Sequence, residues 1–327
     1  MLSCAGLNRP DWKAATAKSM AYLSEKLQNF LALMAIINPP ERLFGYGVML
    51  AIVVVAIVSQ GRNPGRYLRS PFRTDVLHAL WFPLYAFLIA VPLSLQLSYL
   101  VTSYAPFLRL RLLPADPIWF NILVWIVLAD LSQYWLHRSL HRWRWLWMLH
   151  KVHHSQKELN PLTSWRVHWL EFVYLSLGAF GISLLLGDFT GYHSIIIGIL
   201  AASQMAQHSD LDWTYGPFGK IFVSPHFHNR HHSTADEDRD VNFGTLFVIW
   251  DRLFGTARDA PGLASAHGLL GTEDDVPGSF LGQQFYPLSR YLRRREHGMI
   301  STGSADSKPL IRDAKILLKA SRPTFGA

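Results

Sequence analysis

The chain has 327 residues, of which 50% are hydrophobic and 17% are charged. Soluble domains carry about 25% charged residues on average, so this composition favours a membrane protein. The net charge of +8 comes from arginines that lie between apolar segments and not on a polar domain, which argues against a nucleic-acid partner. The single cysteine, Cys4, excludes an internal disulfide.

Residues 12–37 alternate apolar and charged side chains, as an amphipathic helix does, and this pattern ends before Asn38-Pro39-Pro40. Such a helix lies on a membrane surface or packs on the protein, and both readings stay open. Apolar stretches then predict five membrane spans, at about 43–60, 77–101, 118–136, 170–187 and 192–208. Because crossing a bilayer takes about 20 residues, the last two are slightly short or tilted.

Loop charge predicts the orientation of these spans. Residues 61–75 carry four arginines and one aspartate, whereas residues 102–117 carry two arginines and one aspartate. The positive-inside rule therefore places 61–75 in the cytoplasm and 102–117 outside. We expect a multi-pass protein of the inner or plasma membrane in a bacterium, or of the endoplasmic reticulum in a eukaryote.

Eight of the 15 histidines fall in three clusters. His137 and His141 form the first, and the pattern His-x-x-His-His occurs twice, at residues 150–154 and 228–232. Helical residues three or four apart share a face, whereas adjacent residues diverge by roughly 100°. One short helix can therefore offer ligands to two metal ions. An all-histidine set favours iron, zinc, copper or nickel over magnesium or calcium. The predicted topology brings every cluster to the cytoplasmic face.

Two other classes of function fit this pattern less well. A membrane metal transporter needs polar ligands near the bilayer midplane. His78 and Asp130 are the candidate ligands within the predicted spans, whereas the histidine clusters are predicted to lie at one membrane face. A zinc hydrolase of the soluble type is disfavoured because the chain lacks a His-Glu-x-x-His motif and has no carboxylate beside its histidine clusters.

From about residue 118 to 258, an ordered series of motifs resembles the fatty acid hydroxylase/sterol desaturase superfamily. The motifs are Asp130-x3-Tyr134-x2-His137-Arg138-x2-His141, His150-x2-His153-His154-Ser155, Arg166-x-His168-x2-Glu171, His228-x2-His231-His232-Ser233, Asn242-Phe243-Gly244 and Trp250-Asp251-Arg252-Leu253-Phe254-Gly255-Thr256. Acyl-lipid desaturases have similar histidine boxes, but the last two motifs favour the hydroxylase/sterol group.

The resemblance implies a non-haem centre of two iron ions that uses O2 as co-substrate and attacks a C–H bond of a lipid. His208 is expected to be a further ligand, His168 is either a ligand or orients one, and His226 is expected to be a bystander. The other ligands implied by the motifs are His137, His141, His150, His153, His154, His228, His231 and His232.

Three acids are the candidate catalytic residues, expected to hold ligand imidazoles by accepting their second N–H. They are Asp130, Glu171 and Asp251. Asp130 lies inside an apolar span, where an ionisable residue is a candidate functional group. The alternative for each acid is a salt bridge at a helix end with Arg138, Arg142, Arg166 or Arg252.

The lipid substrate is expected to be a sterol, a fatty acyl chain, a sphingolipid or an ether lipid, with hydroxylation favoured over desaturation. Electrons are expected from a separate reductase, ferredoxin or cytochrome, because the sequence has no flavin, haem or iron–sulfur motif.

The expected architecture is an all-α integral membrane bundle with a cytoplasmic, histidine-rich metal-binding cap. Its expected parts are an amphipathic segment (1–42), an N-terminal transmembrane region (43–117), a catalytic domain (118–258) with a membrane hairpin (170–208), and a cytoplasmic extension with a mobile tail (259–327).

Overall fold

The computed structural model is helical. In the part of the chain that it describes, β-structure is limited to two isolated β-bridges, between Phe222 and Phe247 and between Ser233 and His267. The expectation of an all-α fold is confirmed for that part. The predicted amphipathic helix 12–37, the first predicted span 43–60 and the tail lie outside the described residues. Those described are 70–113, 118–187 and 193–290, with Gly47, Ala51 and Val54.

A long helical rod opens the described part. It consists of α3 (Ser70–Tyr85), a π-helical turn (Ala86–Ala90) and α4 (Val91–Tyr104). Pro83 and Pro92 lack the N–H that a regular helix needs, and the π turn between them adjusts the hydrogen-bond ladder. The predicted span 77–101 lies within this rod, which is apolar enough to cross a membrane over Pro71–Tyr104.

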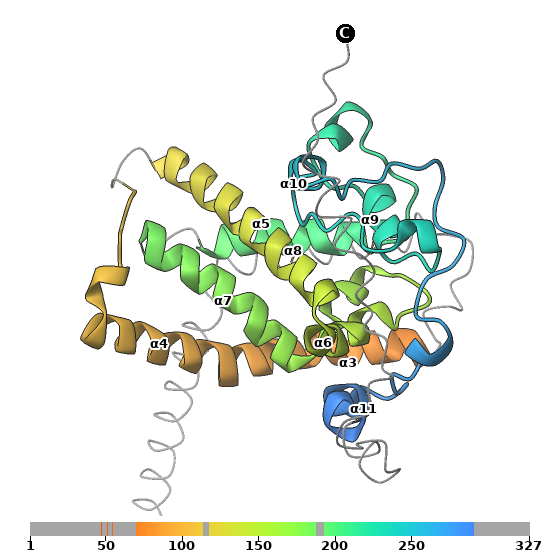
Figure 1. Ribbon diagram of the computed structural model, residues 1–327, viewed down its shortest axis with the longest axis horizontal. Coiled ribbons are helices and arrows are strands. Elements are labelled where there is room, and N and C mark those ends of the chain that lie inside the picture. The colour runs from red at the N-terminus through yellow and green to blue at the C-terminus, as the bar shows by residue number, and fades with distance from the viewer. Residues whose placement is uncertain are drawn as a thin grey trace, which may run out of the picture.

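The rod is longer than a bilayer requires. The 34 residues Pro71–Tyr104 span about 50 Å at 1.5 Å per residue, against a hydrocarbon core of about 30 Å. Its first turns are buried against the histidine-rich part of the protein, since Asp75 and His78 are both fully buried. The start of α3 therefore lies beside the histidine clusters, and the remainder extends away from them (Figure 1).

Three further long helices pack on one another, and the second of them contacts this rod. They are α5 (Ile118–Arg142), α7 (Trp169–Leu186) and α8 (His193–Gln207). Trp125 and Ala129 of α5, Leu186 of α7 and Ile196 of α8 form their shared core. Figure 1 shows α5 and α7 running side by side. Their close approach depends on Gly178, because a Cβ there would lie 2.5 Å from Ser132 Oγ and 2.6 Å from Leu136 Cδ1.

Two of these helices are also long and apolar enough to cross a membrane, over Trp119–Arg142 and Trp169–Leu186. They cover the predicted spans 118–136 and 170–187 except for one residue at one end of each span. Helix α8 lies within the predicted span 192–208 but has 15 residues in the described part, so it is not among the three candidates. Three of the five predicted spans thus have a matching helix.

The remaining short helices form a cap at one end of these long helices (Figure 1). Its parts are α6 (Arg144–His154), α9 (Pro225–His231), α10 (Ile249–Leu253) and α11 (Phe280–Gln284), with 3-10 turns at Pro161–Trp165, Gly216–Lys220, Asp236–Asp238 and Gly271–Glu273. The 3-10 turn Pro106–Leu108 lies at the other end, next to the last turn of α4. Buried Lys151 of α6 joins Glu273 at 2.8 Å and Asp275 at 2.7 Å. The segment after residue 259 is therefore tied to α6 as far as the structure describes it.

The α5–α7 contact gives a matched test. We expect Gly178→Leu to destabilise the protein by about 1–3 kcal/mol, because the new side chain overpacks the contact with Ser132. Gly181→Leu is the control on the same helix, since a Cβ there meets nothing within 4 Å. Thermal unfolding in detergent micelles measures both variants. Equal melting temperatures for the two would contradict this account of the helix contact.

Candidate metal centre

Nine histidines converge in two groups inside the cap. One ring nitrogen of each residue lies within 4.8 Å of the corresponding atoms of all others in its group. The first group is His137, His141, His150, His154 and His231. The second is His153, His208, His228 and His232. All eight histidines of the sequence clusters are thus brought together, and His208 joins them from the end of α8.

Local helix geometry explains how the histidines divide. His150 and His154 lie four residues apart on α6 and face the first group, whereas His153 points to the second. The other box repeats this division in reverse, since His231 faces the first group while His228 and His232 face the second. Each box therefore serves both groups, as the His-x-x-His-His spacing predicts.

Two local features bring α6 and α9 to this position. Trp143 alone separates α5 from α6, and its extended backbone turns the chain so that α6 packs back on α5. Helix α9 begins at a Ser224 cap, whose side chain accepts a hydrogen bond from Phe227 N–H, with Pro225 at the first helical position. The polar start of α9 thus fixes where its histidines lie.

The spacing of the nitrogens fits metal ligation. His208 Nε2 lies 3.1 Å from the Nε2 atoms of His153, His228 and His232. A single N–H on His208 Nε2 could donate a hydrogen bond to only one of these three nitrogens, so hydrogen bonding does not account for all three distances. Nitrogens bound to a common ion at about 2.0–2.1 Å would lie about 3.0–3.4 Å apart at ordinary ligand angles. The first group agrees, since His137 Nε2 and His150 Nε2 are 3.1 Å apart.

Buried nitrogens without partners give the same result. His141 Nε2, His154 Nε2 and His231 Nε2 are buried and make no hydrogen bond in the described part of the chain. Orphaned polar atoms of this kind are costly unless a ligand satisfies them. The donor set is neutral nitrogen throughout, which suits a first-row transition metal better than magnesium or calcium. The residues present therefore fit a pair of such ions.

Backbone carbonyls hold the outer ring nitrogens of three of these histidines, which turns their Nε2 atoms inward. His137 Nδ1 lies 3.0 Å from Phe243 O, His231 Nδ1 lies 2.8 Å from Val241 O, and His208 Nδ1 lies 2.7 Å from Gln204 O. Each carbonyl accepts the Nδ1–H hydrogen bond. Such contacts select the tautomer whose Nε2 lone pair is free for a metal. Sequence motifs did not reveal these carbonyls, because any residue type supplies one.

Burial keeps these imidazoles neutral. Burial lowers the pKa of each histidine in the two His-x-x-His-His boxes well below its usual 6.5. The neighbouring histidines lower these pKa values further. Trp147 and Phe243 cover the first group, with ring centroids 5.0 Å from that of His141 in both cases. The centre is therefore a dry set of neutral donors.

The sequence places this centre among known proteins. Residues 122–256 match the fatty acid hydroxylase family. The chain is 31% identical over 179 residues to the ornithine lipid hydroxylase OlsE of Rhizobium tropici, a match that covers 54% of this chain and 53% of that protein. The comparisons therefore support the resemblance of residues 122–256 to the fatty acid hydroxylase/sterol desaturase superfamily.

Two further relatives extend this comparison. The alkylglycerol monooxygenase of Caenorhabditis elegans is 32% identical over 188 residues, which cover 55% of this chain and 35% of that protein. The rice very-long-chain aldehyde decarbonylase GL1-11 (Oryza sativa subsp. indica) is 29% identical over 181 residues, covering 53% of this chain and 67% of that protein. The matched region spans about half of the ornithine lipid hydroxylase and less of the monooxygenase. No solved structure matches the chain.

The three candidate acids of this hydroxylase-like region have different surroundings. Glu171 Oε1 accepts the Nδ1–H of His150 at 2.7 Å, and its Oε2 is buried without a hydrogen-bond partner in the described part. Asp251 accepts the N–H groups of Phe243 and Gly244, both at 2.8 Å. It thereby fixes the loop whose Phe243 carbonyl holds His137. Glu171 thus contacts a histidine directly, whereas Asp251 acts on one through the backbone.

Asp130 anchors the same loop further along. Its carboxylate accepts Leu246 N–H at 2.7 Å, Phe247 N–H at 3.0 Å and Trp250 Nε1–H at 2.8 Å. These contacts attach α10 to the middle of α5. None of the ion pairs among the described residues joins Asp130, Glu171 or Asp251 to an arginine.

Two other histidines lie outside both groups. His168 caps α7 by accepting Leu170 N–H at 3.1 Å, and its Nε2–H donates to Gln284 O at 2.7 Å. Both of its ring nitrogens are therefore engaged. His226 lies between Asp212 Oδ1 at 2.6 Å and Ala260 O at 2.8 Å.

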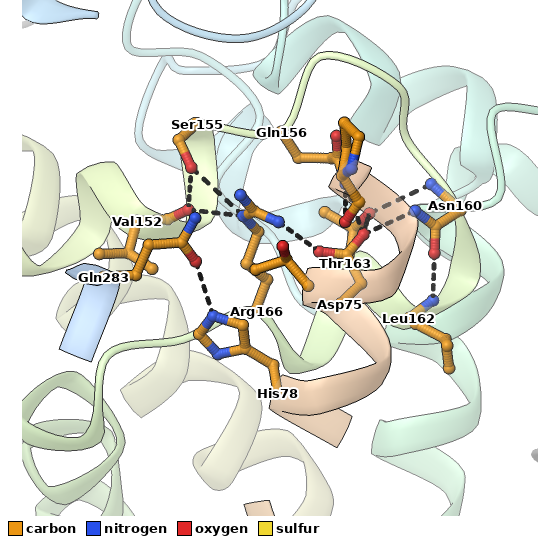
Figure 2. Close-up of polar contacts among 12 residues, drawn as sticks. Asp75, His78, Val152, Ser155, Gln156, Asn160, Leu162, Thr163, Arg166 and Gln283 are labelled. Atoms are coloured by element: carbon orange, nitrogen blue, oxygen red, sulfur yellow. Dashed lines mark hydrogen bonds and ion pairs between the residues drawn. The ribbon is translucent and has the colours of Figure 1, made fainter. Parts of the chain in front are cut away.

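A buried ion pair lies next to the histidine-bearing end of α6, and the sequence did not predict it. Arg166 Nη1 lies 2.6 Å from Asp75 Oδ1, and both side chains are almost fully buried (Figure 2). Arg166 Nε also donates to Val152 O at 3.1 Å, next to His153, and Asn160 Nδ2 donates to Asp75 Oδ2 at 2.7 Å. This network joins the start of α3 to the end of α6.

Glu171 gives a prediction about metal affinity. Glu171→Ala removes the acceptor of the His150 Nδ1–H bond, so we expect metal affinity to fall about 10–100-fold. Glu171→Gln retains an oxygen that can accept this bond, so it should keep most of the affinity. Competition with a chelator followed by metal analysis measures both variants. If the two variants lose affinity equally, the charge of Glu171 matters and not its hydrogen bond.

The buried ion pair gives a second prediction. Asp75→Asn or Arg166→Met alone leaves one buried charge unpaired, and we expect each to cost about 3–5 kcal/mol of stability. The double variant should cost less than the sum of the two, because no buried charge remains. Thermal unfolding checks this cycle. Asp236→Asn, which breaks an exposed pair with Arg239, is the control and should have no measurable effect.

Proposed function

We propose that the chain is an integral-membrane oxidoreductase that hydroxylates a C–H bond of a lipid with a centre of two iron ions. The observation that carries this proposal is the pair of buried histidine groups built by two shared His-x-x-His-His boxes. The relatives named as lipid hydroxylase, alkylglycerol monooxygenase and aldehyde decarbonylase support an oxidative reaction on a lipid.

The reaction balances as a monooxygenation. A C–H bond, O2, two electrons and two protons give an alcohol and water. Two bound iron ions would supply the O2 chemistry, with His137, His141, His150, His154 and His231 as ligands of one and His153, His208, His228 and His232 of the other. The electrons come from a separate donor protein, a reductase, ferredoxin or cytochrome.

The protein's own residues prepare this site. Backbone carbonyls hold the Nδ1 atoms of His137, His208 and His231, and the Glu171 carboxylate holds that of His150, which orients these four imidazoles. Burial keeps them unprotonated, and Trp147 and Phe243 exclude water from the first group. Exclusion of water protects an oxidising centre from side reactions.

The apolar helices support a membrane location. Pro71–Tyr104, Trp119–Arg142 and Trp169–Leu186 expose apolar side chains that suit lipid tails, and the cap lies at one end of them. The loop charges favour the cytoplasmic side for this cap. Residues 118–258 then form the catalytic unit, with 43–117 as the preceding membrane region. The substrate is a sterol, fatty acyl, sphingolipid or ether lipid that reaches the cap from the bilayer.

The histidine groups provide the decisive test. We expect His153→Ala and His231→Ala each to remove at least about half of the bound iron and to abolish lipid oxidation, because each removes a ligand from one group. His226→Ala is the control, since His226 lies outside both groups. Iron analysis of the purified protein and mass spectrometry of lipid extracts measure the two effects.

The product distinguishes the competing reactions. Lipids that gain the mass of one oxygen atom indicate hydroxylation, and lipids that lose the mass of two hydrogen atoms indicate desaturation. Protein that holds no iron, or unchanged turnover in both alanine variants, would refute the proposal. Metal flux across proteoliposomes without lipid oxidation would favour a metal transporter instead.

A further inference from the structure

The cap carries an exposed apolar surface on the segment before α9 and on α10. On residues 213–222, Trp213 is 44%, Phe218 66% and Ile221 52% exposed. On α10, Ile249 is 55% and Leu253 66% exposed. Soluble surfaces rarely gather so many large apolar side chains, and such patches mark a membrane or protein contact.

The two segments form one surface. A β-bridge pairs Phe222 with Phe247, and their rings lie 5.6 Å apart. Val248 N–H donates to Ile221 O at 2.9 Å, and Val223 N–H donates to Leu246 O at 2.9 Å. Residues 213–222 and 249–253 are therefore held together, and we call them the shelf.

Asp130 fixes the depth of the shelf along α5. The three hydrogen bonds from residues 246–250 hold α10 at the level of Asp130. The candidate span begins at Trp119, and the 20 or so residues needed to cross a bilayer end near Arg138. Asp130 then lies about 12 Å inside that boundary at 1.5 Å per residue. Under the proposed membrane location, the shelf is thus attached to a part of α5 that lies within the bilayer.

Positive side chains lie beside this apolar surface. A pocket of about 440 Å³ adjoins the shelf, and its lining includes Lys220, Arg252, His226 and Thr214, with Asp259 as its acid. The ion pair of Arg252 with Asp259 is long, at 4.0 Å, and both side chains are exposed. Lys220 forms none of the ion pairs found among the described residues. Cations at an apolar border are suited to the phosphate of an anionic phospholipid.

We propose that the shelf inserts into the membrane interface, with Phe218, Ile249 and Leu253 among the lipid chains and with Lys220 and Arg252 on the phosphate of an anionic phospholipid. Trp213 and Tyr215 suit the interfacial belt that aromatic residues occupy in membranes. This inference rests on the membrane location in the proposed function. It adds a lipid-contact surface outside the metal centre and independent of the substrate.

Site-directed labelling in a bilayer tests the depth of the shelf. The full chain with Cys4→Ser is given one new cysteine at Phe218 or Leu253, labelled with a nitroxide, and placed in nanodiscs of phosphatidylcholine with phosphatidylglycerol. Leu123→Cys on α5 is the lipid-facing reference, and Asp236→Cys is the water-facing reference. We expect the shelf labels to collide with oxygen, as at 123, and to be shielded from a nickel chelate that reaches 236.

Each other result overturns the inference. Chelate access at 218 and 253, with shielding at 123, puts the shelf in water and leaves the proposed function untouched. Shielding from both reagents shows that protein covers the shelf, as a docked electron donor or second copy would. Chelate access at residue 123 as well would show that α5 does not lie in the membrane, which contradicts both the proposed function and the shelf inference. Metal content of each labelled protein checks that the cap has folded.

The cations are tested by lipid preference. A bimane fluorophore at residue 218 is quenched by brominated phosphatidylglycerol or brominated phosphatidylcholine in matched nanodiscs. We expect roughly fivefold enrichment of the anionic lipid for each cation near the surface. Lys220→Gln/Arg252→Gln should remove this preference, whereas Arg239→Gln, an exposed arginine outside the shelf, should keep it. Equal quenching by both lipids in the parent protein overturns the phosphate assignment.

Discussion

The protein depends on one constraint, which is that nine imidazoles must stay neutral and face each other inside the fold. Burial favours the neutral form of the histidines in the two His-x-x-His-His boxes. The hydrogen bonds to the Phe243, Val241 and Gln204 carbonyls decide which nitrogen of His137, His231 and His208 faces inward. Helices α5, α6, α8 and α9 all contribute, so their packing is set by the needs of the centre. The Asp251 and Asp130 contacts serve the same end by fixing the loop at residues 243–250.

The sequence predicted the histidines of this centre because their spacing is local. Positions 137 and 141, or 150 and 154, share a helix face wherever that helix lies. The resemblance to a family then added His208, which stands alone in the chain. The apolar runs also predicted three helices that the structure contains, because length and hydropathy decide such helices locally.

Contacts between distant residues could not be predicted in this way. The Asp75–Arg166 pair joins residues 91 positions apart, and Asp75 appeared in the sequence as one acid in a basic loop. Asp240, whose carboxylate lies 3.2 Å from His141 Nδ1, belongs to no motif. His168 followed the motif but has both ring nitrogens engaged by backbone groups. These roles depend on contacts between residues far apart in the chain, and the spacing of residues along the sequence does not reveal such contacts.

The division of each histidine box between two groups has a consequence for assembly. Helices α6 and α9 each carry ligands for both groups, so ordering either helix for one group also orders it for the other. The conformational entropy lost in preparing the first site is therefore shared with the second. The two sites are expected to fill cooperatively, and the fully loaded and empty forms should predominate over the form with a single ion.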